Sequence, residues 1–281
     1  MSWAGDPPPR HGPFSLAERW RILRRGIPLA VLVFGGLAVL VLVRLAEAPL
    51  FGQRRPVTPS ITRFVCRNAF RIMGMGWRAE GVPLRGAGAV VANHSTWLDI
   101  FALNAGDRVY FVSKAEVADW PGIGWLARAT GTVFIRRNPR EAHEHVDTFR
   151  RRLAAGHRLV FFPEGTSTDG RRILPFKTTL FAAFLDPDLR ATLTIQPVSV
   201  TYIAPSGEDP RFLGWWGAMD FAPHLARVLA ARRPGEVQLV YHPGLAAADF
   251  NDRKQLAGAA ETAVRSGFAG EAVEHARARR S

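Results

Sequence analysis

An uninterrupted uncharged segment near the N-terminus, residues 26–43, constrains the fold more than any other feature of the sequence. At the rise of an α-helix this segment spans roughly 27 Å, close to the thickness of the hydrocarbon core of a bilayer. A buried core helix or a cleaved signal peptide has a similar composition, and Ala-Glu-Ala at residues 46–48 faintly resembles a cleavage site. The long basic stretch before the segment favours an uncleaved membrane anchor, which either crosses the bilayer or re-enters it.

Four regions follow from this anchor and from the composition on either side of it. Residues 1–14 are rich in proline and predict a disordered tail. Residues 15–57 form the membrane anchor and a linker. Residues 58–80 predict an amphipathic membrane-associated helix, and residues 81–281 predict an α/β domain.

The positive charge of the chain narrows the classes of partner. The net charge is +13, which suits nucleic acid, an anionic membrane surface or a phosphorylated substrate. Arg63, Arg67 and Arg71 recur every four residues and form one stripe, typical of a helix on anionic lipid or of an ordinary surface helix. The apolar anchor favours a membrane surface, and no nucleic-acid-binding motif is present. Cys66 is the single cysteine, which excludes an intrachain disulfide and a cysteine-based zinc site.

Short apolar strands alternate with amphipathic helices from residue 77 onward. This order predicts an α/β fold with a mixed, largely parallel sheet flanked by helices. The predicted strands are residues 77–80, 86–93, 108–113, 132–135, 158–162, 193–202 and 236–241, and the predicted helices are residues 139–155, 176–185, 251–267 and 271–280. Pro197 lies inside one strand, which predicts that this strand is bent or lies near an edge of the sheet.

A histidine and an aspartate meet where the second predicted strand ends. His94 follows the strand, and ligands of α/β proteins bind at the carboxyl ends of strands. Four residues separate His94 from Asp99, and about one helical turn over this spacer brings the Asp99 carboxylate back toward the imidazole. There it can orient the ring and stabilise its charged form. Such a pair is equipped to act as a general base toward a hydroxyl group. A half-exposed histidine beside an unrelated aspartate is the alternative.

Basic residues lie at the end of one later predicted strand and at the start of one later predicted helix. Arg136 and Arg137 stand at the end of the strand 132–135, where two guanidinium groups suit phosphate oxygens, although a solvated basic turn has the same sequence. Lys177 opens the predicted helix 176–185 and adds positive potential for an anion.

The strand 158–162 ends in a turn with a carboxylate. Gly165 permits a tight turn and close approach of the backbone to a ligand. Glu164 can accept a hydrogen bond from a hydroxyl group, and an exposed Glu in a surface turn is the alternative.

Taken together, these blocks resemble the four ordered motifs of the glycerolipid acyltransferase family, whose best-known bacterial member type is the 1-acyl-glycerol-3-phosphate acyltransferase. In this sequence they read His94-x4-Asp99, Gly131-x-x-Phe134-Ile135-x-Arg137, Phe162-Pro163-Glu164-Gly165-Thr166 and Ile195-Gln196-Pro197-Val198. The resemblance implies an O-acyltransferase that uses an acyl thioester of acyl-carrier protein or coenzyme A. It implies a lysophospholipid hydroxyl as acceptor, and no cofactor or metal is expected.

The resemblance also implies roles for single residues. His94 would be the base and Asp99 its orienting partner, while Arg137 would bind the phosphate of the acceptor. Glu164 and Gly165 would shape the acceptor site, and Pro197 would be structural. With them we group Arg136, Thr166 and Lys177 as expected substrate-binding residues.

One departure from the family pattern leaves the acceptor open. The third motif usually continues with Arg after the Thr, and here Ser167 stands in that place. Either Arg171 or Arg172 replaces this charge, or the acceptor lacks a phosphomonoester. Acyltransferases that make ornithine lipids are similar to this family as well, and the Ser-Thr-Asp-Gly sequence of residues 167–170 suits them. The first expectation is therefore 1-acyl-sn-glycerol-3-phosphate, converted to phosphatidic acid, and lyso-ornithine lipid is the alternative.

The residues themselves agree with direct transfer to an alcohol. No Gly-x-Ser-x-Gly sequence is present, so no covalent acyl-enzyme is expected. Backbone amides beside Ser95, near the start of the next helix, are expected to stabilise the oxyanion. We expect the protein at the inner membrane with its catalytic domain on the cytoplasmic face. A non-catalytic basic protein that binds membrane or nucleic acid is the remote alternative.

Overall fold

The computed structural model describes residues 3–9, 12–120, 122–136 and 142–269 of the 281-residue chain. Its strands are β1 (Gly76–Glu80), β2 (Gly88–Ala92), β3 (Tyr110–Lys114), β4 (Val133–Ile135), β5 (Arg158–Phe161), β6 (Thr194–Ile203), β7 (Glu236–Tyr241) and β8 (Leu245–Ala246). Its helices are α1 (Leu16–Phe51), α2 (Thr58–Met73), α3 (Leu98–Gly106), η1 (Ala115–Asp119), α4 (Ile123–Thr130), α5 (Ala142–Ala154), η3 (Thr178–Leu185), α6 (Pro187–Arg190), α7 (Phe221–Ala230), η4 (Ala247–Asp249) and α8 (Arg253–Ser266). Here η marks a 3-10 helix.

The strands form one sheet in the order β1-β7-β6-β2-β5-β3-β4, with β8 beside β6. Strands β6, β2, β5, β3 and β4 run parallel to one another, whereas β7 runs antiparallel to β6 and parallel to β1. The predicted mixed, largely parallel sheet flanked by helices is therefore confirmed. The carboxyl ends of the five parallel strands meet at one edge of the sheet, where sites form in such folds.

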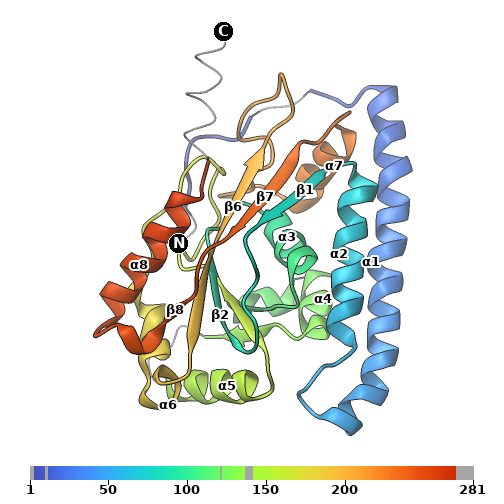
Figure 1. Cartoon of the computed structure of the whole chain (residues 1–281). Helices are drawn as coiled ribbons and strands as arrows, with labels where there is room; N and C mark the ends of the chain where they lie inside the picture. Colours follow the sequence, from blue (N-terminus) through green and yellow to red (C-terminus); the bar gives the residue numbers. More distant parts are fainter. Residues whose placement is uncertain (1–2, 10–11, 121, 137–141, 270–281) are drawn as a thin grey trace.

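Two apolar cores cover the two faces of the sheet. The central strand β2 is buried along its whole length, and its side chains alternate between the faces. Val90 lies in the core beneath α2 and α3, while Val91 lies in the core beneath α8 and η3. In Figure 1, α1 and α2 stand on one side of the sheet and α8 on the other. Because β2 is held from both sides, the residue that follows it has a fixed position.

Pro197 lies in the interior of the sheet, since β6 pairs with β2 on one side and with β7 and β8 on the other. The predicted position near an edge of the sheet was therefore wrong, and the predicted bend stays a prediction. Within a strand the N–H and C=O of one residue point to the same side. The carbonyl of Pro197 accepts a hydrogen bond from His242 N, in the gap between the end of β7 and the start of β8. A missing N–H is tolerated there, because no ladder bond is required in that gap.

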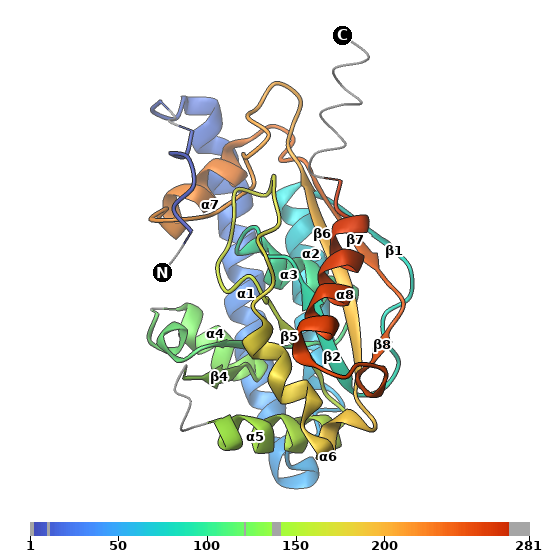
Figure 2. The same cartoon turned by 90° about the vertical axis from the view of Figure 1, so that its left-hand side faces the viewer.

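The predicted basic segment and the apolar segment form one 36-residue helix, α1. Ser15 and Glu18 close its start as a capping box. Within the described residues, α1 is the helix that is long and apolar enough to cross a membrane. Only 11% of the residues in its most apolar 18-residue stretch are buried. Figure 2 shows α7 beside this helix, and buried Arg25 donates hydrogen bonds to the carbonyl oxygens of Leu229, Ala231 and Arg232 at the end of α7. Helix α1 is thus docked on the α/β fold.

Helix α2 is shorter than the predicted amphipathic segment 58–80. It ends at Met73, and β1 begins at Gly76. Two arginines of the predicted stripe, Arg63 and Arg67, donate hydrogen bonds to the carbonyl oxygen of Ala105 at the end of α3. This contact favours a helix packed on the domain over one laid on lipid.

Other elements differ from the prediction as well. The predicted helix 176–185 is the 3-10 helix η3, and α7 was not predicted. The predicted helix 271–280 lies outside the described residues, as does the start of the predicted helix 139–155. The division of the chain into four regions stays a prediction.

Candidate active site

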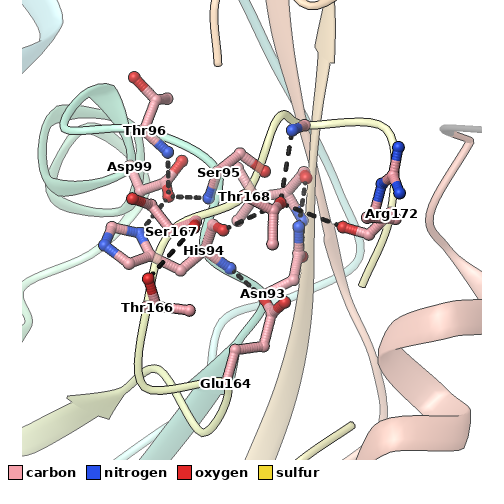
Figure 3. Close-up of polar contacts among 12 residues, drawn as sticks. Asn93, His94, Ser95, Thr96, Asp99, Glu164, Thr166, Ser167, Thr168 and Arg172 are labelled. Atoms are coloured by element: carbon pink, nitrogen blue, oxygen red, sulfur yellow. Dashed lines mark hydrogen bonds and ion pairs between the residues drawn. The ribbon is translucent and has the colours of Figure 1, made fainter. Parts of the chain in front are cut away.

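His94 and Asp99 are in direct contact. His94 follows β2, and its Nδ1 lies 2.7 Å from Oδ2 of Asp99 in the first turn of α3 (Figure 3). The Asp99 side chain is fully buried, whereas 21% of the His94 side chain is exposed. The buried carboxylate therefore orients an imidazole that a substrate can reach.

The same carboxylate oxygen also binds backbone. Oδ2 of Asp99 accepts hydrogen bonds from Ser95 N at 2.8 Å and Thr96 N at 3.1 Å. A carboxylate can only accept hydrogen bonds, so Nδ1 of His94 donates its N–H to Asp99. In the neutral imidazole, Nε2 then keeps a lone pair that can accept a proton. Ser95 N and Thr96 N already donate to Asp99, so these two amides are not free to stabilise an oxyanion in this structure, and the expected role of backbone amides near the start of this helix stays a prediction.

Aromatic rings hold the imidazole from the side. The His94 ring stacks on Phe162 with a centroid distance of 4.2 Å and an interplanar angle of 16°. Phe162 in turn lies beside Phe111. The orientation of His94 is therefore set both by a hydrogen bond and by stacking.

The loop after β5 fixes the backbone of His94 from both ends. Oε1 of Glu164 accepts a hydrogen bond from His94 N at 2.6 Å, and Thr168 N donates to the carbonyl oxygen of His94 at 3.0 Å. Oε2 of Glu164 accepts from Leu174 N at 2.7 Å. Gly165 supplies the turn with a φ of 72°. Glu164 is buried, and both of its oxygens bind backbone amides, so it supports His94 rather than contacting an acceptor hydroxyl in this structure.

Burial raises the pKa of Glu164 from 4.5 to about 8, against the two backbone N–H bonds, which lower it. At Glu164 the folded protein therefore binds more protons than the unfolded chain between these two values. Glu164 thus contributes a fall in the free energy of unfolding as pH rises through the window, by up to about 1.4 kcal/mol per pH unit.

We expect Glu164→Gln to remove this slope between pH 5 and pH 8, because glutamine does not titrate. The variant should also be less stable than the wild type at pH 6, since its amide nitrogen cannot accept a hydrogen bond from Leu174 N. Thermal unfolding in detergent from pH 5 to pH 9 measures both effects. Parallel curves for the two proteins would show that Glu164 does not titrate in this window.

The N-terminal segment contacts the loop after β5. Trp3 N donates a hydrogen bond to Oγ1 of Thr166 at 3.2 Å. The guanidinium group of Arg172 lies over the Trp3 ring and pairs with buried Asp169 at 2.9 Å. Arg172 is therefore already engaged by the protein, which weakens it as a replacement for the missing family arginine.

None of the described contacts joins the predicted cationic residues Arg136 and Lys177 to His94. Arg136 is exposed at the end of β4, three strands from β2 and roughly 14 Å away at the usual strand spacing. Arg137 lies outside the described residues. The Lys177 side chain is exposed, and its backbone N–H donates to the carbonyl oxygen of Pro163.

The sequence did not predict several contacts of the loop that carries His94, because their partners come from distant parts of the chain. Nε1 of Trp97 donates to Nδ1 of buried His224 on α7 at 2.9 Å. Trp215 N donates to the carbonyl oxygen of Ser95. No local sequence signal marks these pairs. Within the residues described, no group of three or more His, Cys, Asp or Glu side chains could hold a metal ion.

Comparison with known sequences gives several relatives. The Acyltransferase family model matches residues 78–201. The lyso-ornithine lipid O-acyltransferase of Rhodobacter capsulatus is 57% identical over 266 residues, covering 95% of this chain and 96% of that protein. The lyso-ornithine lipid O-acyltransferase of Pseudomonas aeruginosa is 33% identical and covers 91% of this chain and 96% of that protein. The 1-acyl-sn-glycerol-3-phosphate acyltransferase of Neisseria gonorrhoeae is 37% identical, over 42% of this chain and 46% of that protein.

A solved structure has the same fold. The crystal structure of the 1-acyl-sn-glycerophosphate acyltransferase PlsC from Thermotoga maritima superposes with a TM-score of 0.61. The match covers 89% of this chain and 95% of that chain, at 20% sequence identity. At this identity the likeness concerns the fold.

Proposed function

The chain belongs to the acyltransferase family, and from that premise we propose that it transfers a fatty acyl group from an acyl thioester to the free hydroxyl of lyso-ornithine lipid. It is an O-acyltransferase that acts on lysolipids. The observation that supports the acceptor is the 57% identity to a lyso-ornithine lipid O-acyltransferase across 95% of this chain. The lysophosphatidate enzyme from Neisseria matches 42% of the chain. The first expectation, 1-acyl-sn-glycerol-3-phosphate, is accordingly the weaker of the two.

The loop after β5 supports the same acceptor. An ornithine head group carries a carboxylate and an amine, and it has no phosphate monoester. Such a head group has less negative charge to neutralise than a phosphomonoester. Ser167 stands where the family pattern has arginine, and the nearby Arg172 is paired with Asp169.

His94 is the general base in this proposal. Its Nε2 takes the proton of the lipid hydroxyl while the oxygen attacks the thioester carbonyl carbon. The C–S bond of the tetrahedral intermediate then breaks, and the imidazolium returns the proton to the leaving thiolate. Asp99 stabilises the imidazolium throughout, and the hydrogen bonds from Ser95 N and Thr96 N hold its carboxylate in place.

The donor and the location follow from the same chemistry. The donor is an acyl-carrier protein or coenzyme A thioester, both of which are cytoplasmic compounds. The acceptor is a membrane lipid, and α1 has the length and composition of a membrane anchor. We therefore place the protein at the inner membrane, with the catalytic domain on the cytoplasmic face.

Acceptor choice is the experiment that tests the proposed function. The purified full-length protein in detergent is given a labelled acyl donor and either lyso-ornithine lipid or 1-acyl-sn-glycerol-3-phosphate. We expect kcat/KM for lyso-ornithine lipid to be at least about tenfold higher, equivalent to roughly 1.4 kcal/mol. Each acceptor is tested with both donors, so that a poor donor is not mistaken for a poor acceptor. Equal or greater use of the phosphate lipid would contradict the proposal.

A further inference from the structure

We propose that residues 3–9, which we call the N-terminal strap, form part of the acceptor site and determine which lysolipid head group the enzyme accepts. The inference rests on the proposed function, because it assigns the strap a role in recognising the acceptor of the same acyl transfer. The strap lies outside the four sequence motifs, and Trp3 and Asp6 are the side chains through which it acts.

The strap contacts the loop after β5 between the two points at which that loop holds His94. Oε1 of Glu164 accepts a hydrogen bond from His94 N, and Thr168 N donates to the carbonyl oxygen of His94 (Figure 3). Thr166 stands between these two residues, and its Oγ1 accepts a hydrogen bond from Trp3 N at 3.2 Å. The strap is therefore attached to the loop that positions the base.

The strap also contacts the loop that precedes α7. Nε1 of Trp216 donates to the carbonyl oxygen of Asp6 at 3.1 Å, and Arg211 donates to the carbonyl oxygen of Pro7 at 3.4 Å. The ring centroids of Trp3 and Trp216 lie 6.4 Å apart. Trp216 is buried, so the strap satisfies a buried indole N–H as well as packing on the ring.

The loop before α7 in turn contacts the residue after His94. Trp215 N donates a hydrogen bond to the carbonyl oxygen of Ser95. A Cβ at Gly214 would overlap the backbone of Asp169, so this loop and the loop after β5 are in close contact. The strap thus bridges two loops that touch each other and that both bind the backbone of residues 94 and 95.

Glycines fix the path of the strap. Gly5 has a φ of 52°, and a Cβ at this position would overlap the ring of Trp3. Gly217 has a φ of 62°, and a Cβ there would lie 3.4 Å from the carbonyl oxygen of Ala4. Chain ends are poorly ordered unless specific contacts hold them. The strap therefore has the contacts of a built part of the site.

The charges around the strap suit a zwitterion better than a phosphomonoester. Arg172 pairs with Asp169 at 2.9 Å, and Arg211 pairs with Asp209 at 2.8 Å, so both guanidinium groups have a carboxylate partner. Asp6 adds an exposed carboxylate on the strap itself. An ornithine head group can offer its ammonium to these carboxylates and its own carboxylate to the guanidinium groups. A phosphomonoester carries close to two negative charges, and Asp6 repels it.

Trp3 supplies the apolar part of this surface. The guanidinium group of Arg172 lies over the Trp3 ring, 5.1 Å from its centroid, so the ring holds this side chain in place. Arg171 adds a further cation in the same loop, and its N–H donates to Asp169. Within the described residues, the hydrogen bonds and ring contacts of the strap do not reach the His94 or Asp99 side chains. The strap is therefore expected to act on acceptor binding rather than on the chemical step.

The first test is Trp3→Ala in the full-length protein. This variant loses the ring but keeps the N–H that binds Thr166. We expect KM for lyso-ornithine lipid to rise at least about fivefold, with kcat and the KM of the acyl donor within about twofold of the wild type. Trp20→Ala is the matched control, because Trp20 is an exposed tryptophan of α1 and makes none of the described contacts of the strap.

The second test is Asp6→Asn, which removes the charge and keeps the carbonyl oxygen that binds Trp216. We expect the ratio of kcat/KM for lyso-ornithine lipid to that for 1-acyl-sn-glycerol-3-phosphate to fall about threefold, as befits one exposed charge. Asp249→Asn removes an exposed charge on η4 and should leave the ratio unchanged. Both acceptors are assayed with one preparation, so this ratio does not depend on the folded fraction.

The wild-type ratio tests the proposed function, whereas the changes in the variants test the strap. A wild-type KM for lyso-ornithine lipid in Trp3→Ala, or an unchanged acceptor ratio in Asp6→Asn, would overturn this inference while the proposed function stands. Equal changes in the two control variants would overturn it as well. A wild type that acylates neither lysolipid would overturn the function and this inference together.

Discussion

Replacing His94 with alanine is expected to lower kcat for acyl transfer by at least about a thousandfold while leaving the fold intact. A general base contributes on the order of 10²- to 10⁴-fold to such a step. Among the described residues, no second histidine joins the hydrogen bonds of His94 and could replace it. The ring is partly exposed, so its removal opens no large cavity in the core. The assay is transfer of labelled acyl chains to lyso-ornithine lipid by protein purified in detergent.

His145→Ala is the matched control for this prediction. His145 lies on α5, outside the loops that hold His94, and its removal should leave the rate within twofold of the wild type. Thermal unfolding of both variants checks that the fold is retained. Turnover by His94→Ala within tenfold of the wild type would refute the role of His94 as base.

Asp99→Asn is expected to lower kcat by roughly 10²- to 10⁴-fold with little change in KM. The amide can place its oxygen where Oδ2 lies and still accept from His94 Nδ1, Ser95 N and Thr96 N. It has no net charge, however, so it cannot stabilise the imidazolium that forms when the hydroxyl loses its proton. If the amide turns the other way, its NH2 group faces three donors and the ring orientation is lost.

Asp107→Asn controls for the loss of one buried negative charge next to α3. Asp107 follows the last residue of the helix and pairs with Arg158 at 2.7 Å, away from His94. We expect it to reduce stability and to leave kcat of the folded fraction near the wild-type value. The double variant of His94→Ala with Asp99→Asn should be no slower than His94→Ala alone, because Asp99 acts through His94. A double variant that is slower than His94→Ala alone, with the two losses of rate multiplied, would show that Asp99 has a separate role.

Sequence predicts the site best where the interaction is local. His94 and Asp99 are five residues apart, so one helical turn after a strand is enough to bring them together. The contact between Glu164 and His94 N joins residues seventy positions apart, and it depends on β5 lying beside β2. A motif can place Glu164 near the site, but it cannot say that both of its oxygens bind backbone amides.

Errors in the predicted fold have the same origin. The rule that proline marks an edge strand is local, and it failed at Pro197 because the gap between β7 and β8 removes the need for an N–H. The stripe of Arg63 and Arg67 is compatible with lipid or with protein, and only the packing of α2 on α3 brings both guanidinium groups to Ala105. Helix α7 is held by contacts with α1, including those of Arg25, which no local pattern reveals.

The acceptor was the least determined part of the sequence prediction, because the motifs encode the reaction more than the head group. Ser167 and the sequence that follows it, to residue 170, were the local signals that pointed away from a phosphomonoester. Similarity across 95% of the chain carried more weight than any motif.

The most direct test of the account is rapid mixing of the protein with a labelled acyl thioester and lyso-ornithine lipid, with quenched samples analysed for label on lipid and on protein. We predict that the label passes from the donor to the lipid as a new ester, with no labelled protein at any time. With His94→Ala the label should stay on the donor. Labelled protein that forms before the lipid product, or transfer by His94→Ala at the wild-type rate, would contradict direct transfer by a hydroxyl that His94 deprotonates.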